Sequence, residues 1–128
     1  MLIDSSAIIK YFTKEPNWES VKSHVIASVT LPFALDELGN ALFKKMRLHE
    51  IGLVDAIEIL VSYQSVAATL DEAEYRAKAL EISFERGIAF YDALFLSAAL
   101  KEKSLLVTCD KRQAEIAESM GIATEFIR

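Results

Sequence analysis

The chain has 128 residues, of which 52% are hydrophobic, and its formal net charge is −5 at pH 7. This length fits one domain over residues 1–128. The negative charge disfavours a protein that holds nucleic acid by bulk electrostatics, although it does not exclude one that holds phosphates through bound cations. The single cysteine rules out an internal disulfide and favours an intracellular, cytoplasmic location, and no segment is long and apolar enough to cross a membrane.

Short apolar segments alternate with helical patterns in the first half of the chain. In chain order we expect a strand over residues 1–3, helices over residues 7–12 and 19–25, a strand over residues 30–34 and a helix over residues 35–48. Pro32 is expected to limit the pairing of the second strand. Gly52 starts the next helix, in which Val54, Ile57 and Val61 recur with a helical period.

The same alternation continues in the second half. We expect an extended segment over residues 66–70, a helix over residues 71–85, a helix over residues 92–101, a strand over residues 105–108, a helix over residues 111–120 and a strand over residues 124–127. Thr69 and Glu72 fit a capping box for the first of these helices, and Gly87 ends it. The second helix is apolar nearly all round, which is typical of a buried helix. The pattern predicts an α/β protein, a three-layer α/β/α sandwich around a mainly parallel sheet.

Four acidic residues lie near points where a strand ends and the next helix begins. Asp4 directly follows the first strand, and Asp110 follows the strand over residues 105–108. Asp92 begins the buried helix, and Glu37 lies in the first turn of its helix. Ligands of open α/β sheets bind outside the carboxyl ends of the strands, so these acids are candidates for a common site.

Each acid taken alone is also well explained as a helix cap. Asp36 and Asp110 are natural caps, and Ser5 or Ser6 fits the first helix. Four converging acids are harder to explain in this way, because clustered carboxylates repel one another unless a cation or protons intervene. Oxygen-only ligands favour Mg²⁺ or Mn²⁺, and the two histidines are too far apart in sequence to suggest zinc.

Four segments, in order, resemble those of the PIN domain family. They read "LIDSSAIIKYF", "LDELGNALFK", "YDALFLSAAL" and "LLVTCD", and the chain looks like the small prokaryotic PIN proteins that include the VapC toxins of VapBC toxin–antitoxin pairs. The resemblance implies that Asp4, Glu37, Asp92 and Asp110 form a catalytic metal site for Mg²⁺ or Mn²⁺ in an endoribonuclease. It also implies an RNA substrate, a VapB-type antitoxin partner and a homodimer.

The resemblance extends to residues around the acids. The family's hydroxyl after the first acid falls on Ser6, and its asparagine after the second falls on Asn40; both are expected to hold a carboxylate or a water. Thr108 could serve in the same way, although a strand residue with no site role is the favoured interpretation. Some members carry a further acid just after the fourth, where this chain has Lys111 and Arg112, so the choice between one and two metals stays open.

Helical spacing places Asn40 and Lys44 on the same face as Glu37. Lys44 and Lys111 each lie within about three helical turns of one of the acids, which makes them candidates for binding the phosphates of RNA, with an ordinary solvated surface as an equally good interpretation. The other basic residues near the acids, Arg112 among them, are better explained as surface.

Hydrolysis of a phosphodiester needs an activated water and stabilisation of the charged phosphate and leaving oxygen, and bound divalent ions can supply all three. The sequence thus favours a metal-dependent ribonuclease, most plausibly the toxin of a toxin–antitoxin pair. A housekeeping RNA-processing nuclease and a non-catalytic interaction module on the same fold remain as alternatives. A phosphoacceptor domain fits least, because such a domain requires a pair of acids at the first strand, where this chain has Asp4 followed by two serines.

Overall fold

A computed structural model describes all residues, 1–128, and contains one five-stranded sheet. The strands are β1 (Leu2–Ile3), β2 (Val29–Thr30), β3 (Ala68–Thr69), β4 (Leu106–Thr108) and β5 (Thr124–Phe126). Their spatial order is β3-β2-β1-β4-β5, and every neighbouring pair is parallel. The predicted parallel sheet is therefore confirmed, with the first strand of the chain at its centre.

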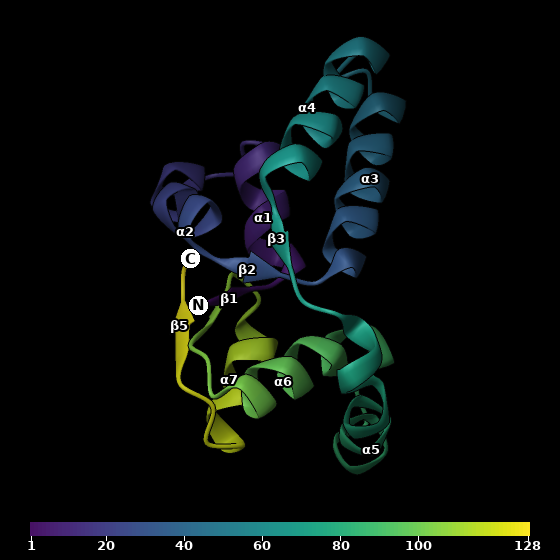
Figure 1. The fold of residues 1–128 in the computed structure, drawn as a ribbon. Helices are drawn as coiled ribbons and strands as arrows, with labels where there is room; N and C mark the ends of the chain where they lie inside the picture. Colours follow the sequence, from purple (N-terminus) through teal and green to yellow (C-terminus); the bar gives the residue numbers. More distant parts are fainter.

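Helices cover both faces of this sheet (Figure 1). The helices are α1 (Ser5–Phe12), α2 (Lys22–Ala27), α3 (Pro32–Arg47), α4 (Leu53–Val66), α5 (Arg76–Arg86), α6 (Phe90–Glu102) and α7 (Lys111–Ser119). Short 3₁₀ turns, Trp18–Val21 and Glu72–Tyr75, precede α2 and α5. In Figure 1, α1 to α4 lie above the sheet and α5 to α7 below it, which gives the predicted α/β/α layers.

The expected start of α3 is wrong. The strand predicted over residues 30–34 ends at Thr30, and Pro32 instead occupies the first turn of α3. Proline suits that position because the first N–H groups of a helix have no partner within it and the fixed φ of proline is already helical. Asp36 consequently lies inside α3 and does not cap it, and Glu37 falls in the second turn.

The capping box predicted for Thr69 and Glu72 is also wrong. Thr69 belongs to β3, and the carboxylate of Asp71 accepts the cap hydrogen bond from the Ala73 N–H at 3.0 Å. The Glu72 carboxylate accepts a hydrogen bond from the backbone N–H of Phe33 at the start of α3. Gly87 does end α5, with the positive φ of 65° that glycine tolerates well.

The core lies on both sides of the two central strands. Leu2, Ile3, Leu106 and Val107 are all fully buried. Beneath them, the seven consecutive residues from Ala93 to Ala99 in α6 are buried, as the all-round apolar pattern predicted. These contacts fix the carboxyl ends of β1 and β4 relative to the start of α6.

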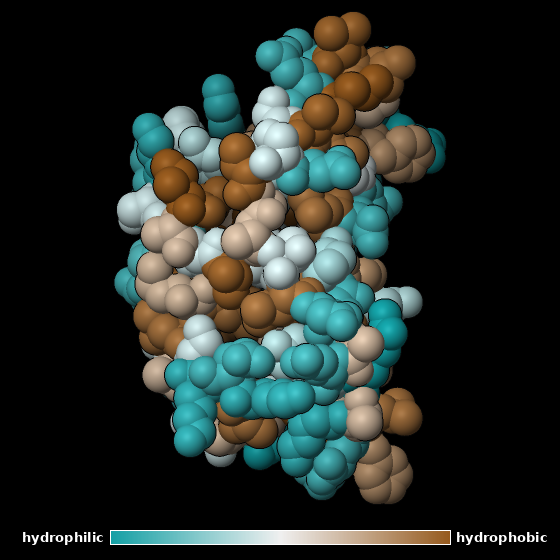
Figure 2. All heavy atoms as spheres, in the orientation of Figure 1, coloured by the Kyte–Doolittle hydropathy of each residue, from teal (hydrophilic) through white to brown (hydrophobic).

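The helical hairpin of α3 and α4 leaves a large apolar surface in water. Val54 is 77% exposed, and Figure 2 shows hydrophobic side chains gathered over this end of the molecule. The exposed apolar side chains of the hairpin are Phe43, Leu48, Leu53, Val54, Ile57, Val61 and Val66. The periodic pattern in α4 is thus real, but much of it faces outward. None of the helices is both long and apolar enough to span a membrane.

Candidate metal centre

The four acids identified in the sequence line one small cavity. Asp4, Glu37, Asp92 and Asp110 share a cavity of about 210 Å³ with two serines and two apolar side chains. The remaining lining residues are Ser5, Ser6, Ile9 and Phe95. Residues more than one hundred positions apart therefore meet where β1 and β4 end.

Asp4 reaches this place because β1 and β4 are parallel neighbours in register. Ile3 pairs with Val107, and the N–H of Asp4 donates to the Val107 carbonyl at 3.1 Å. The Asp4 side chain caps α1, because its Oδ1 accepts from the Ala7 N–H at 3.3 Å. The expectation that Ser5 or Ser6 caps this helix is wrong, since neither hydroxyl does so.

Two hydroxyl groups fix both oxygens of the Asp4 carboxylate. Ser6 Oγ donates to Oδ1 at 2.6 Å, and Thr108 Oγ1 donates to Oδ2 at 2.5 Å. The same hydroxyls accept from the following loop, Ser6 from the Cys109 N–H at 2.8 Å and Thr108 from the Asp110 N–H at 3.1 Å. Thr108, for which a plain strand role was favoured, thus ties Asp4 to the backbone that carries Asp110.

Glu37 enters the cavity from α3. Its carboxylate accepts a hydrogen bond of 2.5 Å from Ser5 Oγ at the start of α1. Nothing in the local sequence around Ser5 points to this contact, because it depends on how α1 packs against α3. Ser5 is one residue that the sequence pattern missed.

Asp92 and Asp110 form the outer side of the cavity and lie at the surface. Asp110 caps α7, as predicted, by accepting from the Gln113 N–H at 3.1 Å. The Gln113 side chain donates to the Asp92 carbonyl at 2.9 Å, so it joins the starts of α6 and α7. Both acids therefore have fixed backbones, and their carboxylates face a common space.

The site concentrates negative charge where solvation is weak. Burial raises the pKa of Asp4 to about 6, against a lowering effect of the Ser6 and Thr108 hydrogen bonds. Partial burial raises the pKa of Glu37 and of Asp92, and neighbouring carboxylates raise them further. Arg112 acts in the opposite direction on Asp92, and the two line a small cavity with Asp110.

The polar side chains that line the cavity offer only oxygen atoms, four carboxylates and two serine hydroxyls, and such a set of donors fits a hard divalent cation. The side chains line the cavity without enclosing one point, because no three acidic, histidine or cysteine side chains lie close enough together to hold one ion. Asp92 and Asp110 are exposed, and one oxygen of Asp110 is engaged in the cap hydrogen bond of α7. Burial raises the pKa of Cys109 to about 11, which keeps this neighbouring thiol neutral.

The expected accessory residues lie at different distances from the acids. Asn40 and Lys44 are exposed and line an adjoining cavity of about 340 Å³ that shares Ile9 and Glu37 with the acid cavity. The Asn40 side chain makes no hydrogen bond to an acid. Lys111 is exposed and lines neither cavity, whereas Arg112, which was assigned to plain surface, lies beside Asp92 and Asp110.

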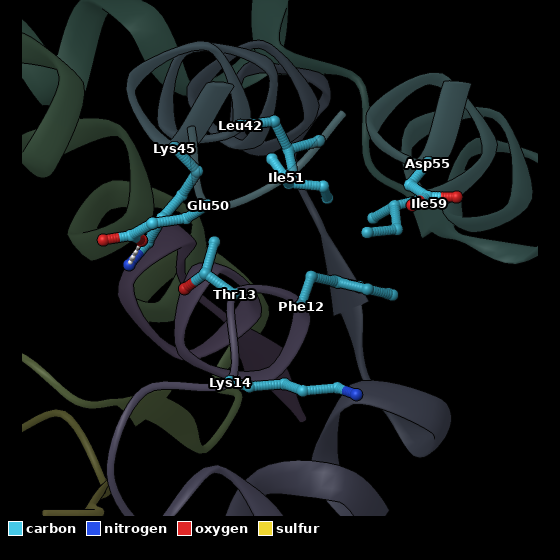
Figure 3. Close-up of a pocket in the computed structure, with 9 residues that line it drawn as sticks. All are labelled: Phe12, Thr13, Lys14, Leu42, Lys45, Glu50, Ile51, Asp55 and Ile59. Carbon is cyan, nitrogen blue, oxygen red and sulfur yellow. Dashed lines mark ion pairs between the residues drawn. The ribbon is translucent and has the colours of Figure 1, made fainter. Parts of the chain in front are cut away.

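A separate cavity of about 360 Å³ lies at the other end of α1 (Figure 3). Phe12, Leu42 and Ile59 contribute apolar walls, and Lys45 pairs with Glu50 at 2.8 Å on its rim. None of the four acids lines it. It is therefore distinct from the candidate metal centre.

The fold and the acid cavity together define a class of α/β/α proteins with a carboxylate cluster at the carboxyl ends of the central parallel strands. Within this class, the chain belongs to the PIN domain family, whose model matches residues 1–119. The predicted family is therefore confirmed.

Known relatives agree with this assignment. The chain is 28% identical to "Exonuclease VapC9" of Pyrobaculum aerophilum, over 99% of this chain and 93% of that protein. The crystal structure of PAE2754 from Pyrobaculum aerophilum superposes with a TM-score of 0.71 at 27% identity, covering 96% of this chain and 88% of that one. VapBC2 from Rickettsia felis, bound to a DNA fragment from its promoter, shares the fold with a TM-score of 0.63 at 17% identity, covering 99% and 98%.

Proposed function

We propose that this protein is a Mg²⁺- or Mn²⁺-dependent endoribonuclease and the toxin of a type II toxin–antitoxin pair. The observation that carries the proposal is the convergence of Asp4, Glu37, Asp92 and Asp110 on one cavity. The nuclease class is supported by the similarity to a protein named exonuclease VapC9. We also propose that its substrate is RNA and that it acts in the cytoplasm.

In this proposal the four carboxylates hold the metal. A bound divalent ion would activate a water and stabilise the charge on the phosphate and on the leaving oxygen. Ser6 and Thr108 orient the Asp4 carboxylate through their hydrogen bonds. Gln113 fixes the backbone of Asp92.

RNA would enter along the adjoining cavity of Glu37, Asn40 and Lys44. The Lys44 ammonium is a local positive charge in a protein whose net charge is −5, and it would bind a phosphate next to the one that is cut. Asn40 can donate to a phosphate or sugar oxygen from the same helix face. Arg112 offers a second cation in the small cavity that Asp92 and Asp110 also line.

A VapB-type antitoxin and a second copy of the chain are the proposed protein partners. The name VapBC2 of the Rickettsia felis structure describes such a toxin–antitoxin assembly. In this chain a cavity of about 550 Å³ lies between α1, α2 and α4, and ten of its twelve lining residues are hydrophobic. The exposed face of the α3–α4 hairpin adds further apolar area, which is typical of interaction surfaces.

The chemistry is tested by incubating labelled linear RNA and circular RNA with the protein in Mg²⁺, Mn²⁺ or EDTA. We expect metal-dependent cleavage of both substrates, since a circle has no end from which an exonuclease can start. Asp110→Asn should abolish cleavage and keep the fold, because asparagine caps helices as well as aspartate does. Cleavage that survives EDTA, or the Asp110→Asn substitution, would contradict the proposal.

A non-catalytic interaction module is the competing function, and the exposed apolar hairpin favours it. Calorimetric titration with Mn²⁺ separates the two. The nuclease requires saturable Mn²⁺ binding that Asp4→Asn removes, whereas a module whose acids are only caps binds no Mn²⁺ at this cavity. The genomic neighbourhood adds a further test, because a small DNA-binding antitoxin encoded just upstream favours the toxin over a housekeeping nuclease.

A further inference from the structure

Two aromatic rings lie near the acid cavity: Phe33, which packs against the edge of the core and lines the adjoining cavity, and Tyr91, which does not belong to the core. Phe33 of α3 and Tyr91 of α6 stack with ring centroids 4.3 Å apart and an interplanar angle of 6°. Tyr91 is nonetheless 54% exposed, and Phe33 is half-buried. A flat aromatic surface of this kind, open to water, is what an unpaired nucleobase uses for stacking.

Each aromatic residue is close in sequence to one of the acids. Tyr91 directly precedes Asp92 on α6, and Phe33 lies four residues before Glu37 on α3. Four residues are about one helical turn, so Phe33 lies on the same face as Glu37, roughly 6 Å further along the axis. Because Tyr91 stacks on Phe33, the aromatic pair lies one helical turn from Glu37 on α3 and at the first turn of α6, which carries Asp92.

The pair also borders the proposed path of the RNA. Phe33 lines the adjoining cavity together with Glu37, Asn40 and Lys44. That cavity and the acid cavity share Ile9 and Glu37, so the two are contiguous. Along α3, the Phe33 ring, the Glu37 carboxylate and the Lys44 ammonium thus follow one another in a single groove, which Asp36 and Asn40 also line.

A hydrogen bond to the backbone of Phe33 anchors one member of the pair. The Glu72 carboxylate accepts from the Phe33 N–H and is itself only 16% exposed. Glu72 lies 3.8 Å from the guanidinium of Arg76. This anchor on the Phe33 backbone and the mutual stacking of the two rings reduce the conformational entropy that the pair loses when a base stacks on it.

We propose that Phe33 and Tyr91 form a stacking subsite for an unpaired nucleobase next to the phosphodiester that is cut. This inference rests on the proposed ribonuclease function and adds a substrate preference to it. Stacking takes the base out of any duplex, so the subsite selects single-stranded RNA or a loop over paired RNA. Because every base has an aromatic face, the subsite tolerates all four bases.

The test measures binding of a labelled single-stranded RNA of about 12 nucleotides, with Mn²⁺ present and Asp110→Asn in every protein to prevent cleavage. Tyr91→Ala should weaken the affinity about 5- to 150-fold, as expected for the loss of one stacked base. Tyr91→Phe should bind like the parent, and Tyr91→Leu should bind nearly as weakly as Tyr91→Ala. Phe84→Ala is the matched control, because Phe84 is a 90% exposed aromatic on α5 that lines neither groove cavity.

A second series replaces one nucleotide at a time by an abasic residue. The parent should lose affinity at one position adjacent to the cleavage site, and Tyr91→Ala should no longer distinguish that position from its neighbours. Equal affinity of Tyr91→Ala and the parent overturns the subsite, and so does a change of oligomeric state in Tyr91→Ala, which would make this face a subunit contact. Absence of metal-dependent RNA cleavage by the unaltered protein overturns the ribonuclease function itself, so the two failures are distinguishable.

Discussion

Replacing Asp4 with asparagine should make the protein more stable at neutral pH. Asp4 is only 5% exposed, and burial raises its pKa to about 6 from an ordinary value of 3.8. Well below pH 3.8 the carboxyl is protonated in both the folded and the unfolded chain. Between about pH 4 and pH 6 the folded protein retains a proton that the unfolded chain has released, so the free energy of unfolding falls as the pH rises.

The size of this effect follows from the two pKa values. An acid with these values in the unfolded and folded chains lowers the free energy of unfolding by about 3 kcal/mol over its whole titration, and by about 2 to 3 kcal/mol between pH 4 and pH 7. In a domain of this size that is a decrease in Tm of about 10 °C. Asp4→Asn lacks the titrating group, and its amide oxygen still accepts from Ser6 and Ala7, so most of this decrease should disappear.

The assay is thermal unfolding of both proteins from pH 4 to pH 8 in EDTA. Glu37 and Asp92 also have raised pKa values and contribute a decrease of the same sign, but they do so in both proteins. The difference between the two curves therefore isolates Asp4. Glu58→Gln, which removes an exposed acid on α4, controls for the loss of one negative charge. Parallel curves for the parent and Asp4→Asn would refute the reasoning.

Three further predictions concern the metal, the groove and the apolar hairpin. Mn²⁺ at one hundred times its Kd should stabilise the parent by about 2.7 kcal/mol at pH 7.5; an equal increase in the Tm of Asp4→Asn would contradict the carboxylate site. Thr108→Val removes the donor to Asp4 Oδ2 and should weaken Mn²⁺ binding about 10- to 100-fold by calorimetry, and an unchanged Kd would show that this hydroxyl does not orient the ligand. Ile57→Lys should change the free energy of unfolding by less than about 0.5 kcal/mol, because Ile57 is 52% exposed. The same substitution should disrupt self-association, measured by light scattering, and antitoxin binding, measured by pull-down. Normal association would exclude this face as an interface.

The sheet was predictable because its strands are short, apolar and separated by helical patterns. Parallel pairing then brings the residues after β1 and β4 to the same edge, so the proximity of Asp4 and Asp110 follows from chain order alone. The buried character of α6 was equally clear, since an all-round apolar helix has no face to offer water.

Contacts between side chains that are far apart in the sequence were harder to predict. The hydrogen bond from Ser5 to Glu37 depends on the packing of α1 against α3, and the stack of Phe33 on Tyr91 depends on the relative placement of α3 and α6. The start of α3 was misplaced because Pro32 after an apolar strand suits a strand edge and a first helical turn equally well. Sequence spacing contains no information on such choices, which tertiary packing decides.

The structure also removes the apparent conflict between a cap and a ligand at Asp4. A carboxylate offers about four lone-pair positions, and three protein donors use them here: Ser6 Oγ, Thr108 Oγ1 and the Ala7 N–H. One position remains toward the cavity that Asp92 and Asp110 also line. Capping α1 is thus compatible with binding a cation, because the Ala7 N–H bond that caps the start of the helix, together with the two hydroxyl bonds, orients the carboxylate and leaves one lone pair without a protein donor. The sequence presented two alternatives for this aspartate, and its geometry allows both at once.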